Sequence, residues 1–171
     1  MKSLLSLMST LMADRIIQWV NSRETSPQPI NHCMSRCVIM QIGYTPYEPV
    51  NCKWQKLYKQ KEMDELNAKA RIVVTHGGPS CYIEVLHLGK TPVVVPRRHE
   101  LGEHIDNHQL EVGREFKKRY GGIILIEDIE TLGESLDNYD SIVENMDRKG
   151  FVSHSMEFCN GLSKIVDGLF S

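Results

Sequence analysis

Two glycines between an apolar run and an expected helix form the stretch of this sequence best suited to bind an anion. The stretch reads His-Gly-Gly-Pro-Ser at residues 76–80, directly after a short β-branched run. Gly77 and Gly78 can adopt backbone angles closed to other residues, and Pro79 suits the first position of a helix, where its missing N–H is no loss. The next N–H groups and the Ser80 hydroxyl would face an anion together with the helix dipole. A phosphate-bearing ligand is the first hypothesis, although a plain strand-to-helix turn explains the loop alone equally well.

Glu84 adds a second feature, because it lies four residues after Ser80 and therefore on the same helix face. Its neighbours are apolar, and a carboxylate among apolar groups is costly unless it finds partners. The vicinal hydroxyls of a ribose would be such partners. The alternative is an ordinary surface glutamate on the polar side of the helix.

A second polar stretch follows another apolar run and extends from Arg97 to Gln109. Asn107, His108 and Gln109 together offer hydrogen-bond donors and acceptors, which suits a polyhydroxylated ligand. Arg97 could neutralise a phosphate, or it could be a solvated surface charge. His104 and His108 have the i, i+4 spacing of metal ligands, but no third ligand is set by the spacing, so we expect no metal site.

An alternation of strands and helices would have to position these two stretches. The strands are expected as continuous apolar runs, which is typical of a parallel sheet covered on both faces. The class is therefore α/β, and ligands in such folds bind beyond the carboxyl ends of the strands. We expect strands at 38–42, 71–75, 91–96 and 122–126, and helices at 3–21, 60–69, 79–88, 103–119, 139–148 and 155–169.

Composition limits the remaining possibilities. The 171 residues suit a single domain spanning 1–171, and a net charge of −2 gives no support to bulk nucleic-acid binding. The first residues read as an amphipathic helix rather than a signal peptide. No apolar run approaches the about 20 residues of a membrane span, so any membrane contact would be peripheral or come through a partner. The odd number of cysteines indicates free thiols in a reducing compartment: Cys33, Cys37, Cys52, Cys81 and Cys159.

Several blocks in fixed order resemble the C-terminal domain of family 28 glycosyltransferases. They read VTHGGPS at 74–80, EVL at 84–86, GKTPVVVPR at 89–97 and EHIDNHQ at 103–109. The sequence is most similar to small bacterial capsule and exopolysaccharide glycosyltransferases, which are similar to the catalytic subunit of the two-component enzyme that adds the second GlcNAc in N-glycan assembly. The resemblance covers about residues 38–136.

The resemblance implies a single Rossmann-like domain, the donor-binding half of a GT-B architecture, and a UDP-sugar donor. By position, the helix start at 78–80 would hold the diphosphate and Glu84 the ribose hydroxyls. His108 and Gln109 would contact the donor sugar. Such enzymes generally need no catalytic metal, and no cofactor is expected, because the helix N-terminus stabilises the leaving diphosphate.

The resemblance also implies a partner. A separate membrane-anchored subunit would supply the acceptor side. The reaction would transfer a hexosyl group to a lipid-linked sugar with inversion at the anomeric carbon. The chain would then be cytoplasmic, held at the inner face of the membrane through that partner. The alternative is a degenerate, non-catalytic paralogue that binds the nucleotide sugar or the partner. A nucleotide-sugar isomerase is less favoured, because it would normally need both domains in one chain.

The N-terminal region departs from the family pattern. Family members begin with a strand and a Gly-Thr loop, whereas residues 1–10 contain no glycine. We therefore expect residues 1–37 to be divergent and the first strand to be altered or replaced. No catalytic base is assigned; His76 and His104 are candidates by proximity and titration range.

Overall fold

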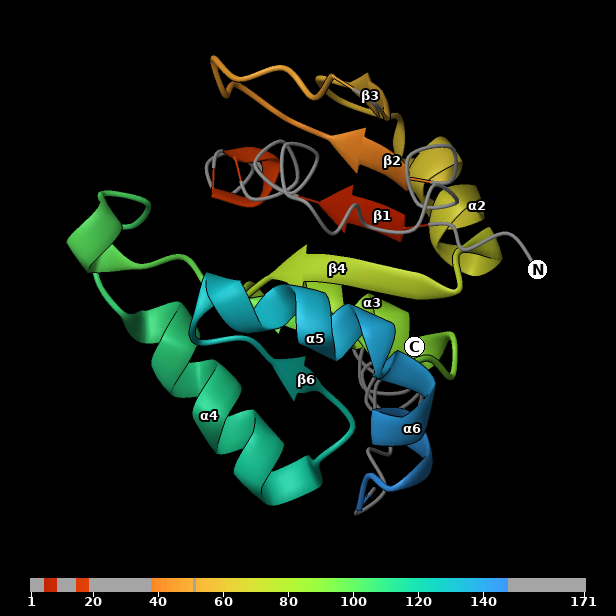
Figure 1. Ribbon diagram of the computed structural model, residues 1–171, viewed down its shortest axis with the longest axis vertical. Coiled ribbons are helices and arrows are strands. Elements are labelled where there is room, and N and C mark those ends of the chain that lie inside the picture. The colour runs from red at the N-terminus through yellow and green to blue at the C-terminus, as the bar shows by residue number, and fades with distance from the viewer. Residues whose placement is uncertain (1–4, 9–14, 19–37, 51, 148–171) are drawn as a thin grey trace, which may run out of the picture.

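The computed structural model describes residues 5–8, 15–18, 38–50 and 52–147, which form a six-stranded sheet with helices on both faces (Figure 1). The strand order is β3-β2-β1-β4-β5-β6, and every neighbouring pair is parallel. The predicted α/β class with a parallel sheet is therefore confirmed. The strands are β1 (Leu5–Met8), β2 (Val38–Gln41), β3 (Lys53–Gln55), β4 (Ile72–His76), β5 (Val93–Val95) and β6 (Ile124–Leu125).

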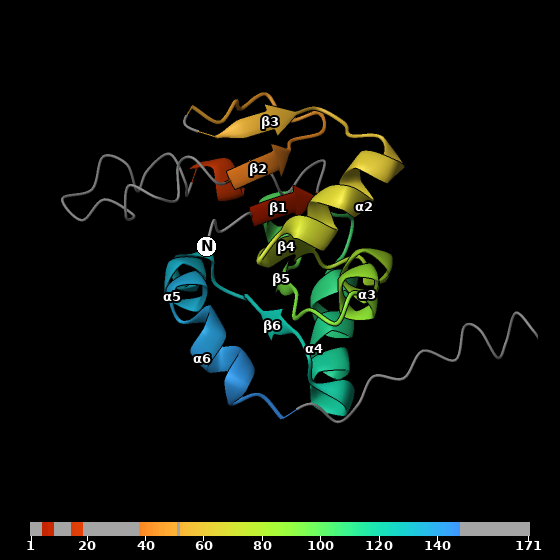
Figure 2. The ribbon, with the colours of Figure 1, turned by 90° about the vertical axis from the view of Figure 1, so that its right-hand side faces the viewer.

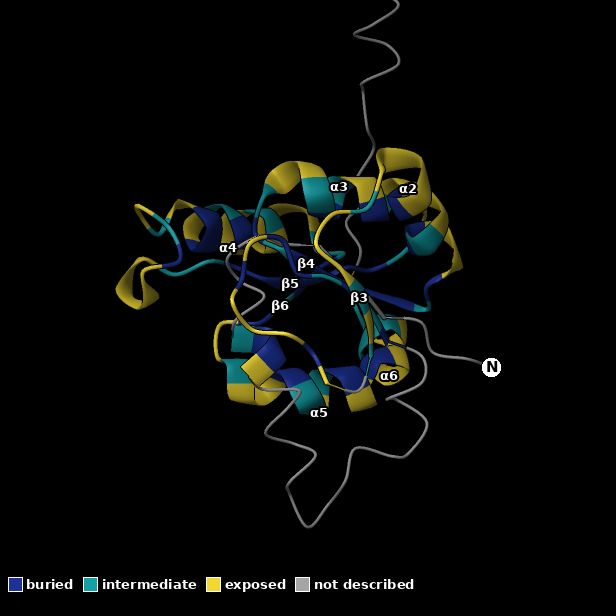
Figure 3. Cartoon of the chain, turned by 90° about the horizontal axis from the view of Figure 1, so that it is seen from above, coloured by how far each residue is buried: buried dark blue, intermediate teal, exposed yellow. Residues whose placement is uncertain are grey.

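The helices make one layer on each side of the sheet, as Figures 2 and 3 show. One layer holds α2 (Gln60–Lys69), α3 (Pro79–His87) and α4 (His108–Tyr120). The other holds α5 (Leu132–Asp137), α6 (Tyr139–Glu144) and the helical residues 15–18. No helix within the described ranges is long and apolar enough to cross a membrane.

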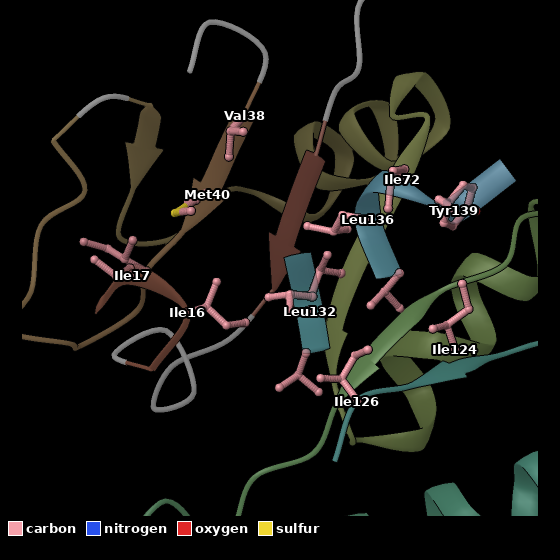
Figure 4. Close-up of a cluster of buried hydrophobic side chains, with 14 residues drawn as sticks. Ile16, Ile17, Val38, Met40, Ile72, Ile124, Ile126, Leu132, Leu136 and Tyr139 are labelled. Carbon is pink, nitrogen blue, oxygen red and sulfur yellow. The ribbon is translucent and has the colours of Figure 1, made fainter. Parts of the chain in front are cut away.

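Alternate residues of β4 and β5 supply the cores of the two layers. In β4, Ile72 and Val74 pack into the cluster that contains Ile16, Leu132 and other side chains of Figure 4, whereas Val73 faces the opposite cluster. Each such residue contributes on the order of 1.5–3 kcal/mol on full burial. Burial on both faces explains why these strands read as unbroken β-branched runs instead of alternating ones.

The chain changes direction between β1 and β4, which makes this the switch point of the sheet. From β1 it moves outward through β2 and β3, and then returns to continue through β4, β5 and β6. In open α/β sheets, ligands bind in the crevice at the carboxyl ends of the strands flanking this point. His76 at the end of β4 lies beside Val95 at the end of β5, so the two polar stretches start at the same edge, as predicted.

Two sequence predictions about elements are wrong. Residues 3–21 were expected to form one helix without the first strand, but Leu5–Met8 is a strand paired with both β2 and β4. A four-residue apolar run has too short a pattern to distinguish strand from helix, and the flanking strands decide. Residues 103–119 were expected to be helical throughout, but α4 begins at His108, because the preceding turns are held by side-chain hydrogen bonds.

The remaining elements agree with expectation in part. Strands and helices at 38–42, 60–69, 71–75, 79–88 and 91–96 are found within one or two residues of their predicted limits. β3 and α5 were not predicted, and the predicted strand at 122–126 is limited to Ile124–Leu125. The expected helix at 155–169 and the family's Gly-Thr loop region at 9–14 lie outside the described residues.

Candidate functional site

Crowding, not backbone angle, explains the two glycines of the β4–α3 loop. Gly78 has φ −68° and ψ 122°, and neither glycine has a positive φ, so the expectation of unusual backbone angles is wrong. A Cβ on Gly77 would lie 2.8 Å from Cβ of Gln109 and 3.1 Å from Cα of Pro96. A Cβ on Gly78 would lie 2.3 Å from Cε1 of His76. The loop therefore brings its backbone close to β5, α4 and an imidazole ring.

The N-terminus of α3 is open. Its N-cap is Gly78, which has no side chain to cap the helix, and no acidic residue lies in its first turn. Pro79 supplies no N–H at the first helical position. Ser80 is exposed, and its N–H has no hydrogen-bond acceptor among the described residues. A helix end of this kind attracts anions through its dipole and its unpaired N–H groups.

Arg97 places a positive charge beside this open helix end. It follows β5, and its backbone N–H donates to Oε1 of Gln109 at 3.1 Å. The Nε atom of its guanidinium is buried and has no hydrogen-bond partner among the residues that the structure describes. A buried donor without an acceptor costs about 1–3 kcal/mol. Such a cost is recovered when an anionic ligand supplies the acceptor.

His76 braces the same loop as a neutral imidazole. Its Nδ1 accepts the N–H of Gly78 at 2.9 Å, and its Nε2 lies 3.3 Å from Sγ of Cys81. Burial, together with the nearby Arg97 and His104, lowers the pKa of His76 to about 4. Burial raises the pKa of the Cys81 thiol. The pair therefore consists of an uncharged imidazole and an uncharged thiol at neutral pH.

A nearly buried ion pair attaches the helical residues 15–18 to the loop after β5. Arg15 donates to both carboxylate oxygens of Glu103, at 3.1 and 3.0 Å, and to the carbonyl oxygen of Pro96 at 2.9 Å. Glu103 also accepts the N–H of Arg98 at 2.9 Å. The pair connects chain that follows β1 to the loop that follows β5. It thereby spans the edge where the switch point lies.

Internal hydrogen bonds shape the rest of the β5–α4 loop, which projects past the strand ends at the left of Figure 1. Asn107 accepts the N–H of His99 at 3.0 Å and donates to Oε1 of Glu100 at 2.7 Å, so both ends of its amide are engaged. Oδ1 of Asp106 accepts the N–H of His108 at 3.0 Å and lies 2.9 Å from Nδ1 of His104. The start of α4 is therefore closed by an acidic side chain.

The structure brings only some of the predicted site residues together. His76, Gly77, Gly78, Arg97 and Gln109 meet at the junction of β4, β5 and α4. Gln109 is buried, and its second amide atom, Nε2, has no acceptor within the described ranges.

The other predicted residues lie around this junction. Glu84 is exposed, so the argument that its carboxylate needs partners is wrong. His108 is exposed at the first position of α4. His104 precedes the helix, so the two histidines do not share a helix face. No cluster of three metal-binding side chains occurs in the described part of the chain.

Sequence reasoning missed the residues that organise the loop. Arg15 and Glu103 are 88 positions apart, and nothing in their local pattern indicates a pair. Cys81 was treated only as a free thiol. Asp106 carried a usable signal, because an acidic residue just before a helix commonly bonds a first-turn N–H. That signal would have placed the start of α4 correctly.

Residues 10–155 match the glycosyltransferase family 28 C-terminal domain. The chain belongs to this family. One relative, the UDP-N-acetylglucosamine transferase subunit ALG13 of Yarrowia lipolytica (strain CLIB 122 / E 150), is 33% identical over 67 residues. The match covers 39% of this chain and 31% of that relative, so the chain spans about a third of the relative's length. The predicted resemblance is confirmed, and family 28 membership supports a sugar-transferring activity.

Proposed function

We propose that this family 28 domain binds a UDP-sugar at the β4–α3 and β5–α4 loops and transfers its sugar to an acceptor hydroxyl. The observation that carries the proposal is the open N-terminus of α3 beside Arg97, whose buried Nε has no partner in the described part of the chain. Two independent features there favour a negatively charged group. The name of the Yarrowia relative, a UDP-N-acetylglucosamine transferase subunit, is consistent with a UDP-sugar donor.

The diphosphate would lie against the start of α3, formed by Gly78, Pro79 and Ser80. Gly77 is needed behind it, because any side chain there would meet Pro96 and Gln109. Negative charge grows on the diphosphate as the bond to the sugar breaks. Preorganised N–H groups and the Arg97 guanidinium stabilise that charge without reorganising at the moment of reaction. The leaving group is then stabilised by this chain's own donors.

The rest of the donor would extend from this point in two directions. Glu84 lies one turn further along α3 than Ser80, about 6 Å by the helix rise, and its exposed carboxylate can accept two ribose hydroxyls. Gln109 has an amide Nε2 available next to the glycine loop, and His108 is exposed beside it. These two would contact the sugar. Asn107 would act on the sugar indirectly, because its amide holds the loop.

We further propose a hexosyl transfer with inversion, in exopolysaccharide or capsule synthesis, to a lipid-linked acceptor supplied by a membrane-anchored partner subunit. The word subunit in the relative's name supports a second chain. The protein would then work at the cytoplasmic face of a membrane, held there by that partner. Co-expression with a candidate membrane-anchored subunit, followed by transfer of radiolabelled sugar, tests this part. Binding of UDP without any transfer would favour a non-catalytic paralogue.

Calorimetry with UDP tests the donor site directly. We expect Arg97→Met to weaken UDP binding by about 10- to 100-fold, since a charged hydrogen bond to phosphate is lost. Stability in urea should not fall, because the guanidinium Nε has no partner to lose within the described ranges. Arg119→Met is the matched control, since Arg119 is exposed and pairs with Glu115 on its own helix, α4. Equal UDP affinity in the Arg97 and Arg119 variants would contradict the proposed site.

A further inference from the structure

The two histidines at this edge of the sheet carry their protons on different nitrogens. A backbone N–H can only donate, so Nδ1 of His76, which accepts from Gly78, carries no proton. The neutral ring must then hold its proton on Nε2, from which it donates to Sγ of Cys81 at 3.3 Å. Both nitrogens of His76 are engaged. Neither offers a lone pair to a substrate.

His104 has the opposite arrangement. Its Nδ1 lies 2.9 Å from Oδ1 of Asp106. The His108 N–H and the neighbouring His104 lower the pKa of Asp106, so its side chain is a carboxylate that can only accept. The Asp106 N–H also points to Nδ1 of His104, at 3.4 Å, but the contact with the carboxylate is the shorter one at 2.9 Å. The proton of the neutral ring is therefore assigned to Nδ1, and Nε2 keeps its lone pair. Nε2 has no hydrogen-bond partner within the described residues.

The loop holds His104 in place from both sides. Before it, Glu103 is tied to Arg15 and to the backbone of Arg98. After it, Asp106 is tied to the first N–H of α4. The carbonyl oxygen of His104 also accepts from Nδ1 of His99 at 3.2 Å. His104 lies in the loop between β5 and α4, which starts at the edge of the sheet where β4 also ends.

We infer that His104 is the base of the sugar transfer and that Asp106 is its positioning residue. This inference rests on the proposed function. The acceptor hydroxyl gives its proton to Nε2 of His104 while its oxygen forms a bond to the anomeric carbon of the donor. The bond between that carbon and the diphosphate oxygen breaks, and UDP leaves with the electron pair. The Asp106 carboxylate stabilises the imidazolium, which then releases its proton to water. His76 has a structural role instead, because its ring accepts the Gly78 N–H in the glycine loop.

Nitrogen NMR of the full chain tests the arrangement without any assay of transfer. Long-range proton–nitrogen spectra report which ring nitrogen is protonated. We expect His104 as the Nδ1–H form and His76 as the Nε2–H form at pH 7.5. Asp106→Ala should remove the preference at His104 and leave His76 unchanged. A dominant Nε2–H form at His104 in the wild-type chain would overturn the inference.

Kinetics of the chain assembled with its membrane partner test the role. With UDP-N-acetylglucosamine as the probe donor, His104→Gln should lower kcat on the order of 100- to 10,000-fold while UDP affinity is retained. Asp106→Asn should lower kcat less, because its oxygen can still orient the ring but carries no charge. His87→Gln, at the far end of α3, is the control. Wild-type kcat in His104→Gln would overturn the base assignment alone, whereas failure of the wild-type chain to bind UDP would instead contradict the proposed function.

Discussion

The N-termini of α3 and α4 lie at the same edge of the sheet, but only that of α4 has an acidic side chain bonded to its first N–H. α3 begins at Gly78 and Pro79, without a capping side chain and without an acid in its first turn. α4 begins after Asp106, whose carboxylate accepts the first helical N–H, and has Glu111 in its first turn. Both helices have the dipole that attracts anions. Of the two, only α3 has no acidic side chain at its N-terminus to interact with this dipole.

The difference shows that a helix dipole alone does not make an anion site. At α4 the protein supplies its own anion, so the helix end is satisfied and the loop before it is held in shape. At α3 the neutral ring of His76 accepts the Gly78 N–H without adding charge. The Arg97 guanidinium then adds positive charge beside the open end. A diphosphate bound there, as we propose, would supply the negative charge that the protein does not place at this helix end.

The largest expected effect comes from placing an acidic side chain at the N-terminus of α3, as Asp106 is placed at that of α4. Ser80→Asp would place a carboxylate where the diphosphate is proposed to bind. We expect UDP affinity to fall by about 100-fold or more through like-charge repulsion, while stability rises by about 0.3–1 kcal/mol through the dipole. Calorimetry and urea unfolding measure the two changes. Ser141→Asp, in the first turn of α6, should give the stabilisation without the loss of UDP binding; parallel losses in both variants would remove the distinction between the helices.

The next effect comes from protonating His76, whose ring accepts the Gly78 N–H at the start of α3. The folded pKa of His76, about 4, lies below its ordinary value of 6.5, so the unfolded chain binds more protons between these pH values. Stability from this group is therefore complete above pH 6.5 and is lost as the pH falls toward 4. Between pH 7 and pH 5 we expect a loss of about 1–2 kcal/mol after allowance for partial exposure. Urea unfolding of His76→Gln at both pH values should show a smaller loss than the wild-type chain, and an equal loss would mean that His76 is not held neutral.

The smallest effect comes from removing the carboxylate that accepts the first N–H of α4. Asp106→Ala removes the acceptor of the His108 N–H, so the first turn of α4 should open more readily. Amide hydrogen exchange there should be about five-fold faster than in the wild-type chain, with the centre of α4 unchanged. Asp106→Asn, which retains an acceptor oxygen, should exchange nearly as slowly as the wild type. If both variants exchange like the wild type, Asp106 does not close this helix.

Periodicity and residue type were sufficient for the elements with strong local patterns. The β-branched runs of β4 and β5 predicted buried parallel strands, and Pro79 after two glycines predicted the start of α3. The short strand β1 could not be predicted in this way, because its four residues form a strand through pairing with β2 and β4. The start of α4 was misplaced because side-chain bonds of Asp106 and Asn107 to nearby backbone compete with helical bonds.

The sequence by itself determined which chemistry is available at the site: the glycine loop, the arginine after β5, the two candidate histidines and a family pattern that the comparison confirms. The tertiary structure decided how these groups are used. It showed that crowding requires the glycines, that the Arg97 Nε lacks a partner among the described residues, and which groups contact the rings of His76 and His104. These properties depend on contacts between β4, β5 and α4, and spacing along the chain does not encode which atoms those contacts satisfy.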